Sequence, residues 1–148
     1  MFIRDLSKCQ EFIAGDQTIL KELFNPLKDG LKLRYSLAHA IVKPGQTTQS
    51  HSLKTSEVYY ILQGNGIMHI DDETAEVTAR QAIYIPPNAK RFIQKTGKQD
   101  LVFLCIVDPA WKPGDETIFW NSTLKLFENQ RPQGRLSGWP QNKKSSEN

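Results

Sequence analysis

Two side chains near the middle of the chain have the types and the spacing of a chemical site. His51 and Glu57 stand six positions apart, and an extended chain places such residues on one side because its side chains alternate between two faces. An imidazole and a carboxylate held together can ligate a divalent metal ion, or can accept and return a proton. Gly45 and Gly64 bracket the segment where the chain would have to turn. The pattern predicts a site carried by a β-strand.

The elements that must position this pair are short strands. Between residues 31 and 109, apolar runs rich in Val, Ile, Tyr and Phe are separated by turn residues. The runs cover residues 31–42, 58–62, 67–70, 82–85, 91–93 and 101–107. Strands of this kind at regular spacing predict an all-β sandwich or barrel, and the absence of alternating helical segments disfavours a parallel sheet.

The segments on either side of the barrel are predicted to be arms. Residues 1–30 form an N-terminal arm, in which apolar residues of 19–27 at helical spacing follow Asp16 and predict a short helix that Pro26 limits. Residues 110–128 form a C-terminal arm, with Asp115 as a candidate N-cap of a short closing helix. Residues 129–148 are mostly polar and are predicted to be a disordered tail.

Composition excludes several classes of function. The 148 residues are 39% hydrophobic and 24% charged, which is typical of one soluble domain with a real core. The net charge of +3 is spread without a basic stripe, so we expect no nucleic-acid partner. The chain has no run of about 18 apolar residues, so we expect no membrane span. The N-terminus lacks a secretory pattern, and Cys9 and Cys105 lie far apart, so we expect a cytoplasmic protein with free thiols.

The residues around His51 resemble the first motif of the cupin superfamily. That motif is a glycine, five residues, His-x-His, three or four residues, a glutamate, six residues and a glycine. Gly45, His51, Glu57 and Gly64 match it, and Leu53 stands where the second histidine would be. The resemblance covers roughly residues 31–109.

The second cupin motif is matched less well. It is a glycine, five residues, Pro-x-Gly, two residues, a histidine, three residues and an asparagine. Pro86 matches, whereas Arg80, Asn88, Arg91 and Lys95 stand where glycine, glycine, histidine and asparagine would be. Two of the four metal-ligand positions are therefore lost, because neither leucine nor a permanently charged arginine can ligate a metal.

The resemblance implies a double-stranded β-helix, the jelly-roll barrel of cupins, with the site inside it. It also implies a homodimer, since small cupins often pair through their sheets. Many members bind Fe, Mn, Ni or Zn through three imidazoles and one carboxylate. Members range from dioxygenases and sugar isomerases to storage and sensor proteins, so the resemblance fixes the fold far better than the reaction.

Three interpretations of the site remain open at this point. In the first, His51 and Glu57 hold one divalent transition metal, with Gln49 or water completing the shell. In the second, Arg91 anchors an anionic ligand, His51 and Glu57 act as an acid/base pair, and Tyr59 contributes its hydroxyl. In the third, Arg91 pairs with Glu57 and the cavity is closed or degenerate.

Other histidines are weaker candidates. His39 could be a substitute ligand only if it faces inward, and Ala38 and Ala40 of opposite parity fit a cavity lining equally well. His69 lies in the apolar run 67–70 next to an acidic turn, where a surface or interface position is expected.

The first functional hypothesis is a small-molecule-binding cupin with weak or no metal binding. If it is an enzyme, isomerase or lyase chemistry by proton transfer on an anionic or sugar-like metabolite suits these groups. The alternative is a non-enzymatic ligand-sensing or binding module with a degenerate site.

Overall fold

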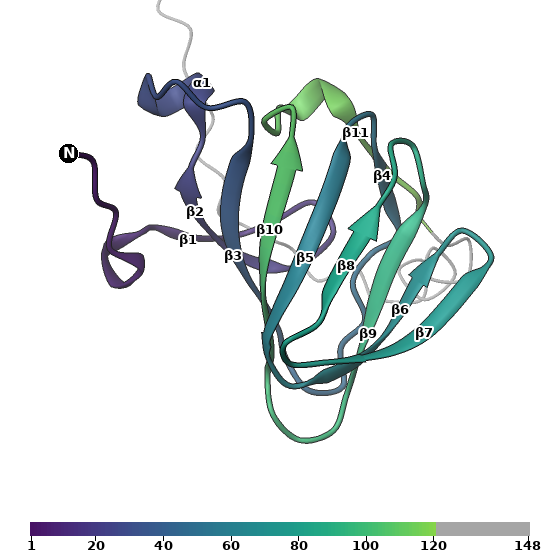
Figure 1. Cartoon of the computed structure of the whole chain (residues 1–148). Helices are drawn as coiled ribbons and strands as arrows, with labels where there is room; N and C mark the ends of the chain where they lie inside the picture. The colour runs from purple at the N-terminus through teal and green to yellow at the C-terminus, as the bar shows by residue number, and fades with distance from the viewer. Residues whose placement is uncertain (121–148) are drawn as a thin grey trace, which may run out of the picture.

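The computed structural model describes residues 1–120, and within them the chain consists mainly of β-strands that face each other in two sheets (Figure 1). Short helical segments are confined to α1 (Pro26–Asp29) and to the 3₁₀ turns Leu6–Lys8 and Pro113–Asp115. The strands are β1 (Glu11–Ile13), β2 (Ile19–Phe24), β3 (Ser36–Val42), β4 (His51–Leu53), β5 (Ser56–Gln63), β6 (Asn65–Ile70), β7 (Glu73–Thr78), β8 (Ala82–Ile85), β9 (Arg91–Thr96), β10 (Leu101–Asp108) and β11 (Glu116–Ile118).

The two sheets have the antiparallel arrangement of a jelly roll. One sheet has the order β1-β2-β3-β10-β5-β8, and the other has the order β11-β4-β9-β6-β7. The edge strands β7 and β8 do not pair, so the barrel is open along that side. The predicted all-β jelly-roll fold is confirmed, and none of the helices in residues 1–120 could span a membrane.

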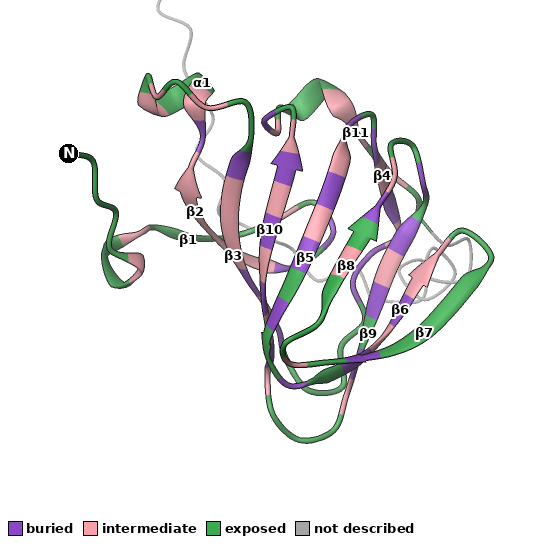
Figure 2. Ribbon diagram, in the orientation of Figure 1, coloured by how far each residue is buried: buried purple, intermediate pink, exposed green. Residues whose placement is uncertain are grey.

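The core forms where the inner faces of the two sheets meet. Along β10 every second residue is buried, as the alternating colours in Figure 2 show, which is the pattern of a strand with one face inward. The facing residues of β5 and β9 follow the same alternation. The most deeply buried apolar side chains are Ala40, Ile61, Ile85, Ile93, Leu101 and Phe103.

The helix predicted after Asp16 is wrong over residues 19–24. These residues form β2, which pairs with β3 in the register Ile19 to Ile41. A helix through residue 26 would lose a backbone hydrogen bond at Pro26, whereas the strand finds its partners on β3. The helix begins only at Pro26, with Asn25 as its N-cap accepting a hydrogen bond from the amide of Leu27.

The C-terminal arm also differs from the prediction. Asp115 does not cap a helix but ends the 3₁₀ turn, and the following residues form β11, which pairs with β4. Residues 121–128 of the predicted arm and the predicted tail, 129–148, lie outside the described residues. The domain boundaries at residues 30 and 109 remain predictions.

Lys95 is a buried, positively charged side chain that contacts no counter-charge in the described part of the chain. Lys95 on β9 lies opposite Gly66 and is 4% exposed. Its Nζ has no hydrogen-bond partner among residues 1–120. A buried ammonium without a partner destabilises the folded state.

Replacing this ammonium should therefore stabilise the protein. We expect Lys95→Met to raise the free energy of unfolding by about 1–3 kcal/mol, because it removes an unsatisfied buried charge and keeps the volume. Guanidinium-induced unfolding measures the change. The exposed Lys98→Met should change stability by less than about 0.5 kcal/mol. A Lys95→Met protein less stable than the parent would contradict the interpretation.

Candidate functional site

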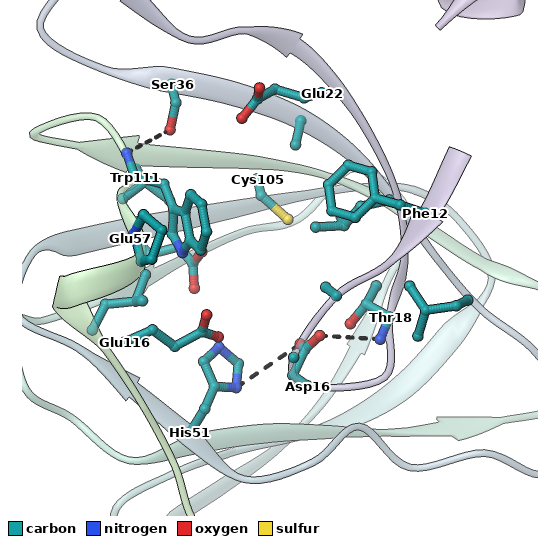
Figure 3. Close-up of a pocket in the computed structure, with 18 of the residues that line it drawn as sticks. Phe12, Asp16, Thr18, Glu22, Ser36, His51, Glu57, Cys105, Trp111 and Glu116 are labelled. Atoms are coloured by element: carbon teal, nitrogen blue, oxygen red, sulfur yellow. Dashed lines mark hydrogen bonds and ion pairs between the residues drawn. The ribbon is translucent and has the colours of Figure 1, made fainter. Parts of the chain in front are cut away.

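A cavity of about 590 Å³ lies between the two sheets, at the end of the barrel opposite the filled core. Strands of the barrel and both arms contribute to its wall (Figure 3). The polar residues of the lining are Asp16, Thr18, Glu22, Lys28, Ser36, His51, Glu57, Tyr59, Cys105 and Glu116. The cavity therefore collects most of the chemistry-bearing side chains in one place.

His51 enters the cavity from β4 in a fixed orientation. Its Nδ1 lies 3.1 Å from the backbone oxygen of Gln49, and a carbonyl can only accept, so Nδ1 carries a hydrogen. A carboxylate oxygen of Asp16 lies 3.9 Å from the same nitrogen. The other ring nitrogen, Nε2, is turned toward Glu116 at the cavity wall (Figure 3). In the neutral ring, Nε2 is the nitrogen with the free lone pair.

Glu57 and Arg91 form a buried ion pair between the two sheets. Nε and Nη2 of Arg91 lie 3.3 and 3.0 Å from Oε1 of Glu57, and Nη1 donates to the backbone oxygen of Ala89. Arg91 is fully buried and is not part of the cavity wall, whereas Glu57 is. Burial raises the pKa of Glu57, and the charges of Arg91 and His51 oppose that rise. Arg91 therefore pairs with Glu57, as the third interpretation of the sequence expected. The cavity beside this pair is open, whereas that interpretation expected it to be closed or degenerate.

Of the two further predicted ligand-binding residues, Tyr59 lines the cavity and Gln49 does not. Tyr59 lines the cavity, with its ring 4.5 Å from that of Phe103 between centroids. Burial raises the pKa of Tyr59 well above its usual range, so the phenol keeps its proton. The side-chain amide of Gln49 donates to the backbone oxygen of Phe119 and is not part of the wall. Gln49 thus ties β11 to the barrel.

The other two histidines lie outside the cavity wall, and both cysteines are free thiols. His39 lies on the outer face of β3, because its neighbours Ala38 and Ala40 face the cavity and the core. His69 stacks on Phe92 at a centroid distance of 4.1 Å. Both cysteines are free, and burial raises the pKa of Cys105, which faces the cavity as a thiol.

Sequence reasoning missed two carboxylates that face His51. Asp16, in the turn before β2, is 7% exposed and accepts a hydrogen bond from the amide of Thr18. Its backbone oxygen accepts from the amide of Gln49, which fixes the turn against β4. Glu116 comes from β11, opposite Leu53. Burial raises the pKa of Glu116, with the charge of His51 lowering it and that of Asp16 raising it.

The predicted metal centre does not fit these side chains. Leu53 is a buried hydrocarbon at one expected ligand position, and Arg91 at another directs its positive charge at Glu57. Within residues 1–120, no three His, Cys, Asp or Glu side chains are grouped so that they could hold a metal ion. A divalent ion of Fe, Mn, Ni or Zn held by His51 and Glu57 would meet the guanidinium of Arg91, which would repel it.

Comparison with known proteins agrees with this architecture. Residues 38–107 match the family described as cupin domain, which spans the strands from β3 to β10. The chain belongs to the cupin superfamily. An uncharacterised protein of Methanocaldococcus jannaschii is 39% identical to this cupin over 116 residues, which is 77% of this chain and 91% of the relative.

Two solved structures illustrate the shared fold of this cupin. The polyketide cyclase RemF from Streptomyces resistomycificus is 20% identical with a TM-score of 0.70, covering 88% of this chain and 94% of its own. The nucleoside dehydratase Pac13 of Streptomyces is 17% identical with a TM-score of 0.64, covering 80% and 91%. At these identities the likeness shows the fold of the cupin and not its reaction.

The buried ion pair leads to a prediction about stability. Arg91→Met leaves the carboxylate of Glu57 buried without its counter-charge, so we expect a loss of about 3–5 kcal/mol in the free energy of unfolding. The double variant Arg91→Met with Glu57→Gln should recover most of that loss, because neither charge remains. Denaturant unfolding measures both variants. If the single variant lost less than about 1 kcal/mol, the pair would not have the structural role assigned to it.

The raised pKa of Glu116 leads to a prediction about pH. A folded-state pKa above the ordinary value of 4.5 means that the folded protein holds this proton more tightly than the unfolded chain. The resulting stabilisation is present below pH 4.5 and is lost as the pH rises through the raised value. Glu116→Gln stays neutral, so its melting temperature should rise relative to the parent between about pH 4 and about pH 7.

Scanning calorimetry across that range measures this difference. Glu76→Gln, at an exposed position of β7, is the matched control and should show no such trend. A difference for Glu116→Gln that stays flat or shrinks with rising pH would show that Glu116 is not held in a desolvated position.

Proposed function

We propose that this cupin is an enzyme that moves a proton on a small substrate, by isomerase or lyase chemistry, with His51 as its acid/base group. The observation that carries the proposal is the fixed imidazole. Because Nδ1 donates to the backbone oxygen of Gln49, the neutral ring presents Nε2 as a base at the cavity wall. Asp16, 3.9 Å from Nδ1, stabilises the positive charge that the ring acquires when it takes the proton.

Two further residues suit the other requirements of such a reaction. Tyr59 keeps its phenolic proton and can donate it in a hydrogen bond to a substrate oxygen. Glu57 makes its hydrogen bonds to Arg91 through Oε1, so Oε2 is left to accept a hydrogen bond from a substrate that enters the cavity. In this proposal Arg91 is a positioning residue that holds Glu57, rather than the anion anchor expected from the sequence.

The proton-transfer step can be written in full. Nε2 of His51 takes a proton from a carbon next to a substrate carbonyl, and the electron pair of the broken C–H bond forms a C=C bond. The carbonyl oxygen takes up the negative charge and accepts the hydrogen bond of Tyr59. If the α-carbon carries a hydroxyl, its proton passes to the enolate oxygen, and His51 returns its own proton to the former carbonyl carbon, so that the carbonyl moves to the α-carbon and an isomer results. If the β-carbon carries a hydroxyl, the C=O bond re-forms, the electron pair of the enolate makes a C=C bond between the α- and β-carbons, and the hydroxyl leaves as water with the proton from His51. Pac13, a nucleoside dehydratase, is an example of a dehydration carried out by a protein of this fold.

The homodimer remains a proposal for this cupin. The outer face of the β5–β8 sheet supports it, because Tyr60, Leu62 and Tyr84 are 39%, 45% and 64% exposed there. Apolar side chains that lie together on an exposed sheet face are typical of subunit contacts.

Isotope exchange tests the proposed chemistry without knowledge of the natural substrate. We expect the protein in D₂O to accelerate exchange of the C–H protons next to the carbonyl of hydroxyacetone or aminoacetone, followed by proton NMR. His51→Gln should lower the protein-dependent rate by roughly 100-fold or more, because the general base is lost. His69→Gln is the matched control, since His69 lies outside the cavity wall, and it should retain the parent rate.

The opposite result has a clear meaning. If neither compound exchanges faster with the protein than in buffer, or if His51→Gln exchanges as fast as the parent, proton transfer by His51 is ruled out for these probes and the proposal is rejected. A compound that stabilises the protein and shows no exchange would instead favour the ligand-sensing alternative.

A further inference from the structure

The cavity holds more negative than positive charge. Four carboxylates line it, and two of them have cationic partners: Glu22 pairs with Lys28 at 2.8 Å, and Glu57 pairs with Arg91. Among the described residues, Asp16 has only His51 within ion-pair distance, and no ion pair forms at Glu116. With a neutral His51 two negative charges are uncompensated, and with a protonated His51 one still is.

Most of the hydrogen-bonding groups in this part of the cavity are acceptors, so they suit a ligand that donates hydrogen bonds. Carboxylates accept and cannot donate, and Nε2 of a neutral His51 accepts as well. Thr18 lines the cavity, is 3% exposed, and its Oγ1 has no hydrogen-bond partner among residues 1–120. That atom has almost no accessible surface, so the acceptors that a ligand in this part of the cavity can reach are the carboxylates and Nε2 of His51.

Two aromatic side chains in the wall of the cavity suit a ligand with an apolar body and a positive charge. Phe12 and Trp111 lie on opposite sides of the cavity with Cys105 between and behind them (Figure 3). Aromatic faces attract both flat apolar groups and cations. The volume of about 590 Å³ is within the range of pockets for small metabolites.

We propose that the cavity selects substrates bearing a protonated nitrogen group, such as an ammonium, amidinium or guanidinium, on an apolar body. The nitrogen lies between the carboxylates of Asp16 and Glu116 and donates hydrogen bonds to them. The body lies between Phe12 and Trp111. This inference names the substrate class of the same cavity and so rests on the proposed function. It departs from the anionic ligand expected from the sequence, because the guanidinium behind that expectation is bonded to Glu57.

Three compounds of nearly equal shape and different charge test the proposal. Benzamidine is a cation at neutral pH, benzamide is neutral and benzoate is an anion. Isothermal titration calorimetry with the full chain should show benzamidine binding at least tenfold more tightly than benzamide, and benzoate binding most weakly. Glu116→Gln should weaken benzamidine binding several-fold, because it removes a negative charge and keeps the shape. The exposed Glu76→Gln should leave it unchanged.

Several outcomes would overturn the proposal: benzoate or benzamide binding as tightly as benzamidine, no benzamidine binding at millimolar concentration, or benzamidine binding that Glu116→Gln leaves intact. The two proposals also fail separately. A charge preference without His51-dependent isotope exchange rejects the proton-transfer chemistry alone. Exchange that depends on His51 without a charge preference rejects the substrate class alone.

Discussion

The site is organised around one buried ion pair. A guanidinium with no exposed surface is stable in a barrel only if it has a counter-charge and its donors are satisfied, and Glu57 and the backbone of Ala89 meet both conditions for Arg91. The pair connects β5 of one sheet with β9 of the other. It holds the carboxylate of Glu57 at the cavity wall and takes the place where two metal ligands would be expected. The positive charge is thus built into the protein rather than supplied by an ion.

The rest of the site comes from the segments before and after the barrel strands. The turn before β2 brings Asp16 to within 3.9 Å of Nδ1 of His51, and β11 brings Glu116 to the side of Nε2 (Figure 3). These segments pair with barrel strands, β2 with β3 and β11 with β4, so backbone hydrogen bonds to the barrel position the segments that bring in the two carboxylates. The barrel strands supply the imidazole, the phenol and the ion pair, and the ends supply the uncompensated negative charge.

Much of this could be predicted from the sequence, and the failures have physical causes. The spacing of His51 and Glu57 predicted one strand with both residues on a shared face. Instead His51 lies on β4 of one sheet and Glu57 on β5 of the other, and both line the cavity because the two sheets face each other. Asp16 and Glu116 could not be found this way, because pairing between distant strands, rather than local spacing, brings them to His51. The helix predicted over residues 19–24 failed because half-buried strands and short amphipathic helices share the same apolar pattern, and Pro26 was the residue that could have distinguished them.

The dependence of the cavity on both ends has a consequence for the timing of folding during synthesis. Strands β3 to β10 are complete when residue 108 has left the ribosome, and by then His51, Glu57 and Tyr59 can already be in place. Glu116 is eight residues further along the chain and joins only when β11 pairs with β4. A nascent chain therefore carries Asp16 and the imidazole of His51 before it carries Glu116, so the proposed base would be in place before the second carboxylate of the proposed cation site.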